Sequence, residues 1–173
     1  MSIVNFFRTL FFNSKNKKCT LKKEQLIFIK GLIGKTPTNH SIFHEALTHS
    51  SYTKDSYSNE RMEYLGDSVI NFIIATYLFE KYKDKTEGGL SIVRAYLSSR
   101  KHLSYVAGKI KLKKALNLGP SIKHPNTKKL EGDALEAFVS AIYLDQGIGK
   151  ARQFIIKYII EPYETQEAFY KRT

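Results

Sequence analysis

The stretch Asn59-Glu-Arg-Met-Glu-Tyr-Leu-Gly-Asp67 places three carboxylates, Glu60, Glu63 and Asp67, at spacings of three and four residues. On an α-helix such positions lie one above another on a single face. The residues between and after them are mostly apolar, so this acidic stripe lies on a helix that otherwise forms core. Because stacked like charges destabilise a helix, the stretch predicts a compensating group outside it, most economically a divalent cation.

The apolar pattern on both sides of this stretch predicts an all-α fold, a helical bundle around one long central helix. The long helix should span about 59–82, and because it is apolar around nearly its whole circumference, we expect it to be buried. Shorter helices are expected before and after it, and no alternating strand pattern is visible. Their expected ranges are 21–33 (ended by Gly34), 41–47 (capped by Ser41), 90–99, 101–111, 128–145 (ended by Gly147) and 149–160 (ended before Pro162).

A second acidic segment, Glu131-Gly-Asp-Ala-Leu-Glu136, carries two carboxylates three residues apart. Asp133 and Glu136 share a helix face, whereas Glu131 lies about 200° away from Asp133, so we leave it out of the site. If the two acidic faces meet, they form a site of four carboxylates. The alternative is two solvated acidic faces that never meet.

A glycine precedes an aspartate in both acidic segments, at Gly66 and Gly132. Glycine inside a helix costs about 1 kcal/mol relative to alanine. Two such residues beside two acids therefore suggest that the helices approach closely there. This favours convergence of the two faces, with Glu63, Asp67, Asp133 and Glu136 in one site.

The expected site offers only hard oxygen ligands, because no cysteine and no histidine at helical spacing accompany the acids. Such a ligand set favours Mg²⁺, with Mn²⁺ as a substitute, over zinc. No small-molecule cofactor is expected. In a basic protein, a carboxylate-bound metal suits phosphodiester hydrolysis.

The composition indicates a polyanionic partner. The chain has 173 residues, a net charge of +12 and a pI near 9.6, which favours nucleic acid or an anionic membrane surface. Residues 1–12 are apolar but too short to span a bilayer and lack signal-peptide features. We expect them to dock on the core, and contact with a membrane surface is the alternative. The single Cys19 excludes an intramolecular disulfide and fits a cytoplasmic location.

These motifs resemble the signature of the ribonuclease III family, and the resemblance covers roughly residues 24–160. It implies an all-helical endonuclease domain that forms homodimers and uses Mg²⁺ to cut double-stranded RNA. The implied products have 5′-phosphate and 3′-hydroxyl ends with staggered 3′ overhangs, and the implied role is processing of rRNA or other RNA. Further matching segments are Ala46–Tyr52, Glu87–Ser91, Gly132–Ala137 and Ala141–Asp145.

The resemblance also assigns roles by position. Glu63, Asp67, Asp133 and Glu136 match the family's metal-binding and catalytic acids, and Glu60 and Glu87 match two further acids of its catalytic valley. Tyr64 matches an aromatic residue that inserts into the partner subunit. His44 and His49, which precede the acidic helix, are expected to be structural.

We expect a basic, Phe-rich extension over 1–20, a nuclease domain over 21–165 and a tail over 166–173. Bacterial members commonly continue into a double-stranded-RNA-binding domain, so the chain is either a nuclease-domain fragment or a form that works without that module. The rival interpretation is a non-catalytic RNA-binding or ribosome-associated protein on the same fold, which would be expected to lose one or more of the metal-binding acids.

Overall fold

The computed structural model describes residues 20–52, 58–120, 122 and 127–170, with the side chains of 127–129 and 166–170 left out. Over these residues the chain is helical and has no strand, which confirms the all-α prediction. One isolated bridge pairs Thr48 with Asn117. The elements are α2 (Lys23–Ile33), α3 (His40–Ala46), α4 (Glu60–Lys81), α5 (Glu87–Leu97), α6 (Arg100–Lys109), the 3₁₀ turn η1 (Leu112–Ala115), α7 (Thr127–Gln146), α8 (Ile148–Ile155), the π-helical η2 (Ile156–Ile160) and α9 (Glu161–Tyr170).

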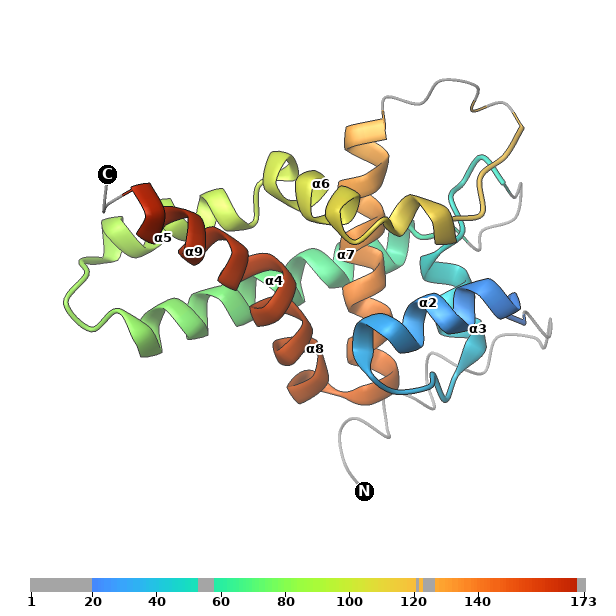
Figure 1. Ribbon diagram of the computed structural model, residues 1–173, viewed down its shortest axis with the longest axis horizontal. Coiled ribbons are helices and arrows are strands. Elements are labelled where there is room, and N and C mark those ends of the chain that lie inside the picture. Colours follow the sequence, from blue (N-terminus) through green and yellow to red (C-terminus); the bar gives the residue numbers. More distant parts are fainter. Residues whose placement is uncertain (1–19, 53–57, 121, 123–126, 171–173) are drawn as a thin grey trace.

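Helix α7 forms the centre of the domain and crosses both α4 and α6 (Figure 1). From Leu130 to Ile142, every residue of α7 is buried except its three acids. The ring of Phe138 on this helix packs against Phe28, Phe43 and Phe154 from three other helices. The core therefore gathers around α7, and the acids of α7 lie where it opens to the surface.

The prediction that α4 is buried around its circumference is wrong. Met62, Ile70 and Ile74 are buried, but Phe72 and Phe79 are 59% and 67% exposed. One face of α4 packs against α7, while α5 covers only part of the remainder. Aromatic residues on the outer face made the sequence look apolar all round, which periodicity alone cannot distinguish from burial.

Helix ends follow local chemistry, and the cap of α3 differs from the prediction. Gly34 and Gly147 end α2 and α7 at φ 70° and 83°, in the left-handed region that favours glycine. Asn39 rather than Ser41 caps α3, because its side chain accepts a hydrogen bond from the Ser41 N–H at 3.1 Å. Asp145 from α7 accepts a further bond from the Asn39 N–H at 2.8 Å and fixes this corner.

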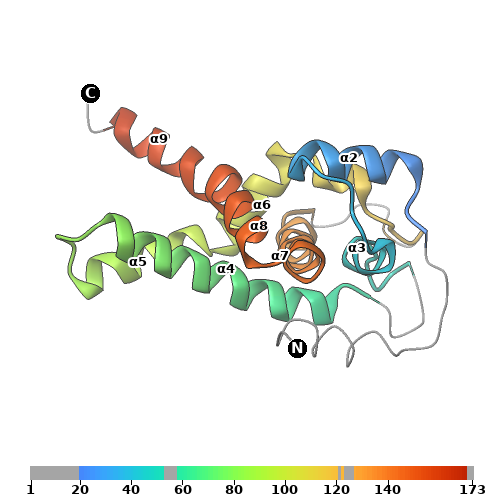
Figure 2. The same ribbon diagram turned by 90° about the horizontal axis from the view of Figure 1, so that it is seen from below.

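Pro162 does not end the last helix. The chain continues from α8 through the π-helical η2 directly into α9, and Pro162 is the second residue of α9. Because the helix is continuous here, Pro162 removes one N–H from its interior, and the π-helical η2 directly before it is where the hydrogen-bond pattern departs from that of an α-helix. Helix α9 projects away from the bundle (Figure 2). The expected boundary at 165 falls inside α9, so the division into domains stays a prediction, and residues 1–19 lie outside the described part.

No helix among the described residues is both long enough and apolar enough to cross a membrane.

Candidate metal centre

Helices α4 and α7 touch backbone to backbone at Gly66. A Cβ atom placed on Gly66 would lie 1.9 Å from the carbonyl oxygen of Glu136, which no side chain could tolerate. The glycine therefore permits the close approach that the sequence predicted for α4. This contact also brings the acidic face of α4 against the acidic face of α7.

At this crossing three carboxylates converge. Glu63, Asp133 and Glu136 each offer an oxygen, and these atoms all lie within 4.8 Å of one another. All three side chains are half-buried. Asp67, one turn after Glu63, is exposed at the edge of the group, and its charge acts on Glu136. The structure thus brings the two acidic faces together, and the alternative of separate solvated faces is wrong.

Glu136 is the electrostatic centre of this acidic cluster, which we define as Glu63, Asp67, Asp133 and Glu136. Burial, followed by the charges of Asp67, Glu63 and Asp133, raises the pKa of Glu136 to about 8, while Arg100 opposes the shift. Without a cation, Glu136 therefore holds a proton at neutral pH. A divalent cation would remove the repulsion that keeps the proton bound.

Two polar neighbours of the acidic cluster were not predicted. Arg100, the first residue of α6, lies 3.6 Å from Asp133 as an ion pair, and Asn71 donates from Nδ2 to Oδ1 of Asp67 at 2.9 Å. Asn71 follows Asp67 by four residues, so helical spacing would have found it. Arg100 comes from a separate helix, and nothing in the sequence indicates its position.

Gly132 does not have the role that the sequence suggested. A Cβ atom there would lie 3.1 Å from Oγ of Ser104 and 3.6 Å from Cγ of Arg100, so Gly132 faces α6 instead of α4. The two glycines are therefore not paired across one helix contact. Gly66 lets α4 approach α7, and Gly132 lets α6 approach α7 from another side.

The other predicted site residues are not part of the acidic cluster. Glu60 is exposed at the start of α4, one turn before Glu63. Glu87 begins α5, beyond the far end of α4, and accepts a hydrogen bond from Ser91 at 2.7 Å. The rise of 1.5 Å per residue places Lys81, at that far end, about 21 Å from Asp67. Tyr64 is 80% exposed on α4. The roles of these three residues stay predictions.

The segment Ala46–Tyr52 has a structural function in this chain. Nδ1 of His49 and Oγ of Ser51 share a hydrogen bond at 2.8 Å, and the Ser51 hydroxyl accepts from the Gly119 N–H at 3.0 Å. A Cβ atom on Gly119 would meet the Ser51 carbonyl oxygen at 1.9 Å. Burial, with a contribution from Lys22, lowers the pKa of His44. Both histidines therefore fit the expected structural role.

The donor chemistry of the acidic cluster fits a hard divalent cation. Carboxylate oxygens alone, half-buried and close together, match the ligand preference of Mg²⁺ and Mn²⁺. Glu63, Asp133 and Glu136 would hold the ion, with Asp67 beside them. The orientation of Asp67 is fixed from outside by the amide of Asn71.

Comparison with known proteins agrees with this geometry. A sequence model described as Ribonuclease-III-like matches residues 39–163. The chain is 40% identical over 145 residues to a protein named Ribonuclease 3 from Borreliella burgdorferi, covering 80% of this chain and 59% of that protein. It is also 40% identical over 149 residues to a Ribonuclease 3 from Clostridium perfringens, covering 79% and 60%. The chain thus spans about three fifths of the length of these relatives.

Comparison with solved structures identifies the same family. Two nuclease-domain structures of ribonuclease III from Campylobacter jejuni superpose with TM-scores of 0.71 and 0.72 at 31% and 30% identity. They cover 78% and 80% of this chain, and the chain covers 95% of each. One of them is described in terms of flexibility in a region involved in its dimer formation. By sequence and by fold, the chain belongs to the ribonuclease III family.

Proposed function

We propose that this chain is a nuclease domain that hydrolyses phosphodiester bonds in double-stranded RNA with the help of Mg²⁺. The observation that carries the proposal is the convergence of Glu63, Asp133 and Glu136 within 4.8 Å, with Asp67 beside them. The family supports double-stranded RNA as the substrate. The products would be 5′-phosphate and 3′-hydroxyl ends with staggered 3′ overhangs, formed during processing of rRNA or other cytoplasmic RNA.

The residues of the acidic cluster would divide the work. Glu63, Asp133 and Glu136 bind the cation, and Arg100 orients Asp133 through their ion pair. When bound, such a cation activates a water for attack on phosphorus and stabilises the leaving oxygen. The contact at Gly66 fixes the distance between the ligands of α4 and those of α7. Selection of RNA would rest on A-form shape and 2′-hydroxyl contacts, with little sequence preference.

The direct test is incubation of the chain with duplex RNA in Mg²⁺, in Mn²⁺ and in EDTA, with duplex DNA of the same sequence as the control. We expect cleavage of RNA in both metals, none in EDTA and none of DNA. RNA binding without cleavage in any metal would instead support the non-catalytic RNA-binding alternative. Cleavage that persists in EDTA would contradict a metal mechanism.

We further propose that the chain acts as a homodimer. Each chain supplies one acidic cluster and cuts one strand, so a staggered double-strand break needs two clusters related by a two-fold axis. Tyr64 is 80% exposed next to the cluster, and Phe72 is 59% exposed on the same helix, which supports α4 as the interface.

Replacement of Tyr64 with alanine should weaken this dimer. Loss of a well-packed aromatic contact costs about 3 kcal/mol, which corresponds to about a 100-fold rise in the dissociation constant. Sedimentation equilibrium measures the constant, and Ile27→Ala on α2, which removes a side chain that is 64% exposed, is the control. If Tyr64→Ala and Ile27→Ala associate equally well, Tyr64 is not at the interface.

A further inference from the structure

The positive charge of the chain is concentrated in one segment. Between Glu87 and Glu131 there are ten lysine and arginine residues and no aspartate or glutamate. This segment alone accounts for most of the net charge of +12. It includes α6, the 3₁₀ turn η1 and the start of α7. Among the described residues of this segment, only Arg100 contacts the acidic cluster, through its ion pair with Asp133, so most of the cationic stretch lies elsewhere on the surface.

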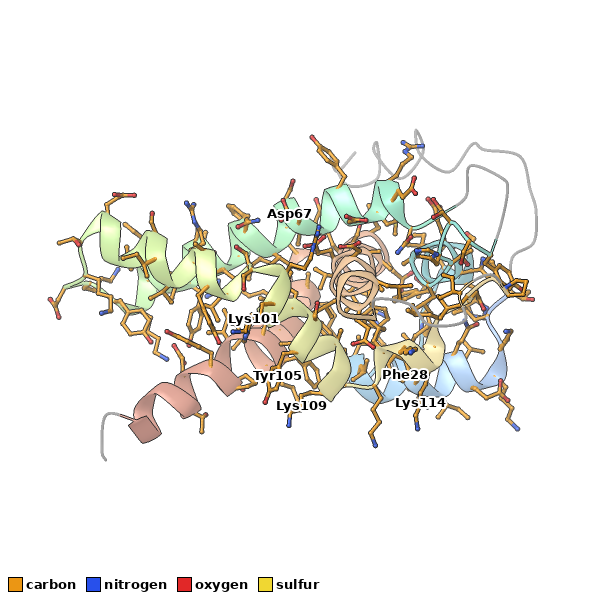
Figure 3. The ribbon with its side chains drawn as sticks, turned by 90° about the horizontal axis from the view of Figure 1, so that it is seen from above. Phe28, Asp67, Lys101, Tyr105, Lys109 and Lys114 are labelled. Carbon is orange, nitrogen blue, oxygen red and sulfur yellow. The ribbon has the colours of Figure 1, made fainter. Side chains whose placement is uncertain are left out.

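Helix α6 displays this charge on its outer face. Lys101, Tyr105 and Lys109 follow one another at four-residue spacing and share a face. Tyr105 is 54% exposed, and Nζ of Lys109 lies 5.2 Å from the centroid of its ring. The opposite face of α6, including Leu103, is buried against α7 and the core. Figure 3 shows these side chains and Lys114 of η1 along the side of the molecule away from Asp67.

In the described part of the chain, no ion pair is seen for these lysines. The pairs Lys81–Glu164, Arg100–Asp133 and Arg152–Glu80 do not involve Lys101, Lys109, Lys111 or Lys114. The α7 residue Glu131 reaches α6 beside Gly108, where a Cβ atom would lie 3.7 Å from its carboxylate. We call Lys101, Tyr105, Lys109, Lys111 and Lys114 the α6 ridge.

Lys111 occupies a position that favours glycine. It directly follows the end of α6 with φ 60°, and it is the one residue other than glycine with positive φ in the described part of the chain. A side chain in the left-handed region strains the backbone. A lysine here therefore extends the row of charges at the expense of local stability, and strained positions of this kind often mark functional surfaces.

From these observations we propose that the α6 ridge binds the phosphate backbone of RNA that flanks the segment being cut. The inference rests on the proposed function for the identity of the nucleic acid. Arg100 connects the two surfaces, because it begins α6 and pairs with Asp133 of the acidic cluster. The rise of a helix makes the distance from Lys101 to Lys109 about 12 Å, enough for several phosphates.

A membrane fits the α6 ridge less well than RNA does. Surface-bound helices set lysines against a broad apolar face that enters the lipid. On α6 the only large exposed apolar side chain is Tyr105, whereas the strongly exposed Ile27, Phe72 and Ile92 lie on other helices. The ridge thus has the charge of a polyanion site without the apolar face of a membrane anchor.

The test compares two matched charge-neutralising variants. Lys101→Gln with Lys109→Gln removes two charges from the α6 ridge. The control variant, Lys150→Gln with Lys157→Gln, removes two charges from α8 and η2 at the other end of α7. Like Lys109, Lys157 lies over a tyrosine ring, with its Nζ 5.0 Å from the centroid of the Tyr158 ring. Fluorescence anisotropy in EDTA measures affinity for two RNA duplexes, one of about 10 base pairs and one of about 30 that extends past the cut segment.

For the long duplex, we expect the ridge variant to bind about 10-fold more weakly and its salt slope to fall by about 2. For the short duplex, its affinity should stay at the wild-type value, and the α8 variant should bind both duplexes like the wild type. Equal losses for both variants, equal losses on both duplexes or no loss at all would each overturn the assignment. Loss of binding to phosphatidylserine vesicles alone would assign the ridge to membranes and overturn it as well.

A third variant, Lys111→Gly, separates binding from folding. Glycine relieves the left-handed strain, so the melting temperature should stay the same or rise while affinity for the long duplex falls. Unchanged affinity would remove Lys111 from the α6 ridge. The maximal cleavage rate in Mg²⁺ at saturating RNA distinguishes the two proposals. A wild type that does not cleave but shows the binding pattern above refutes the function alone, and a wild type that cleaves without that pattern refutes the ridge alone.

Discussion

The carboxylates that pack against the two halves of α4 have opposite surroundings. Near its C-terminal end, Glu164 from α9 accepts hydrogen bonds from Tyr77 at 3.0 Å, Lys81 at 2.6 Å and Tyr82 at 2.7 Å. Burial alone would raise the pKa of Glu164, but these three bonds outweigh it and hold the pKa below its usual value. Burial and the neighbouring Glu164 also raise the pKa of Tyr82 to about 12. This acid is satisfied within the protein.

Near the N-terminal end of α4 the protein supplies far less compensation. Glu136 faces Asp67, Glu63 and Asp133, and burial together with these charges raises its pKa to about 8. Among the described side chains, Arg100 is the cation that opposes this shift, and its ion pair with Asp133 is 3.6 Å long. The comparison teaches that Glu164 is compensated by hydrogen bonds within the protein, whereas the described residues leave most of the repulsion in the acidic cluster uncompensated, as the proposed cation site requires.

The largest expected effect comes from Glu136→Gln, which keeps the shape of the side chain but cannot supply the carboxylate that a cation would bind. Cleavage of duplex RNA in Mg²⁺ should fall by more than about 100-fold, since even the outer partners of metal ligands cost 10- to 100-fold. The melting temperature without metal should stay close to the wild-type value, because a neutral amide replaces a carboxyl group that is protonated at neutral pH. Glu131→Gln on the same helix is the control and should cut normally. Wild-type rates in Glu136→Gln would remove Glu136 from the site.

The helix crossing itself is tested by two glycine substitutions. Gly66→Ala puts a methyl group against the Glu136 carbonyl and should lower the free energy of unfolding by about 3 kcal/mol. Gly132→Ala comes close only to the Ser104 hydroxyl, at 3.1 Å, with Arg100 at ordinary contact distance, and the gain in helix propensity offsets the strain, so its stability should stay within about 1 kcal/mol of wild type. Urea unfolding measures both. Equal tolerance of the two alanines would show that the contact at Gly66 is not the tight one.

The smallest expected effect concerns the other end of α4. Glu164→Gln should cost about 1 kcal/mol at pH 7, a modest value because Lys81 is nearly half exposed. Since folding lowers the pKa of Glu164, its contribution is complete above the unfolded pKa of about 4.3 and is lost as the pH falls further. The stability difference from wild type should therefore close below about pH 4.

The control for this prediction is Glu80→Gln, which breaks only the exposed pair with Arg152 and should change stability by less than about 0.5 kcal/mol. A difference between Glu164→Gln and wild type that persists unchanged at pH 3 would show that the charge of Glu164 is not what ties α9 to α4.

Much of the fold follows from local signals in the sequence. Helical periodicity with Gly34 and Gly147 gives most helix boundaries to within a few residues, because glycine at a helix end has a direct steric cause. Pro162 misled the prediction, since a proline usually ends a helix, but here the helix continues through it after the π-helical η2. The exposed Phe72 and Phe79 misled it too, because burial depends on which neighbours are present, and periodicity does not report them.

The candidate site was predictable where its residues share a helix. Glu63 with Asp67, and Asp133 with Glu136, follow from spacing, and Gly66 correctly indicated a close helix contact. The partner of Gly132 and the ion pair of Arg100 depend on how α6 packs against α7, a tertiary arrangement without a local signal. The α6 ridge shows the same limit, since its charge is visible in the sequence but the side of the molecule on which it lies (Figure 3) is not.

The central claim is that the crossing of α4 and α7 forms a site for a divalent cation, and metal binding without RNA tests it most directly. Titration of Mn²⁺ followed by electron paramagnetic resonance measures the free ion in wild type, Glu136→Gln and Glu131→Gln. We predict that the wild type and Glu131→Gln bind Mn²⁺, that Mg²⁺ displaces it, and that Glu136→Gln loses this binding. Identical binding curves for the wild type and Glu136→Gln, or a wild type that leaves all Mn²⁺ free, would contradict the claim.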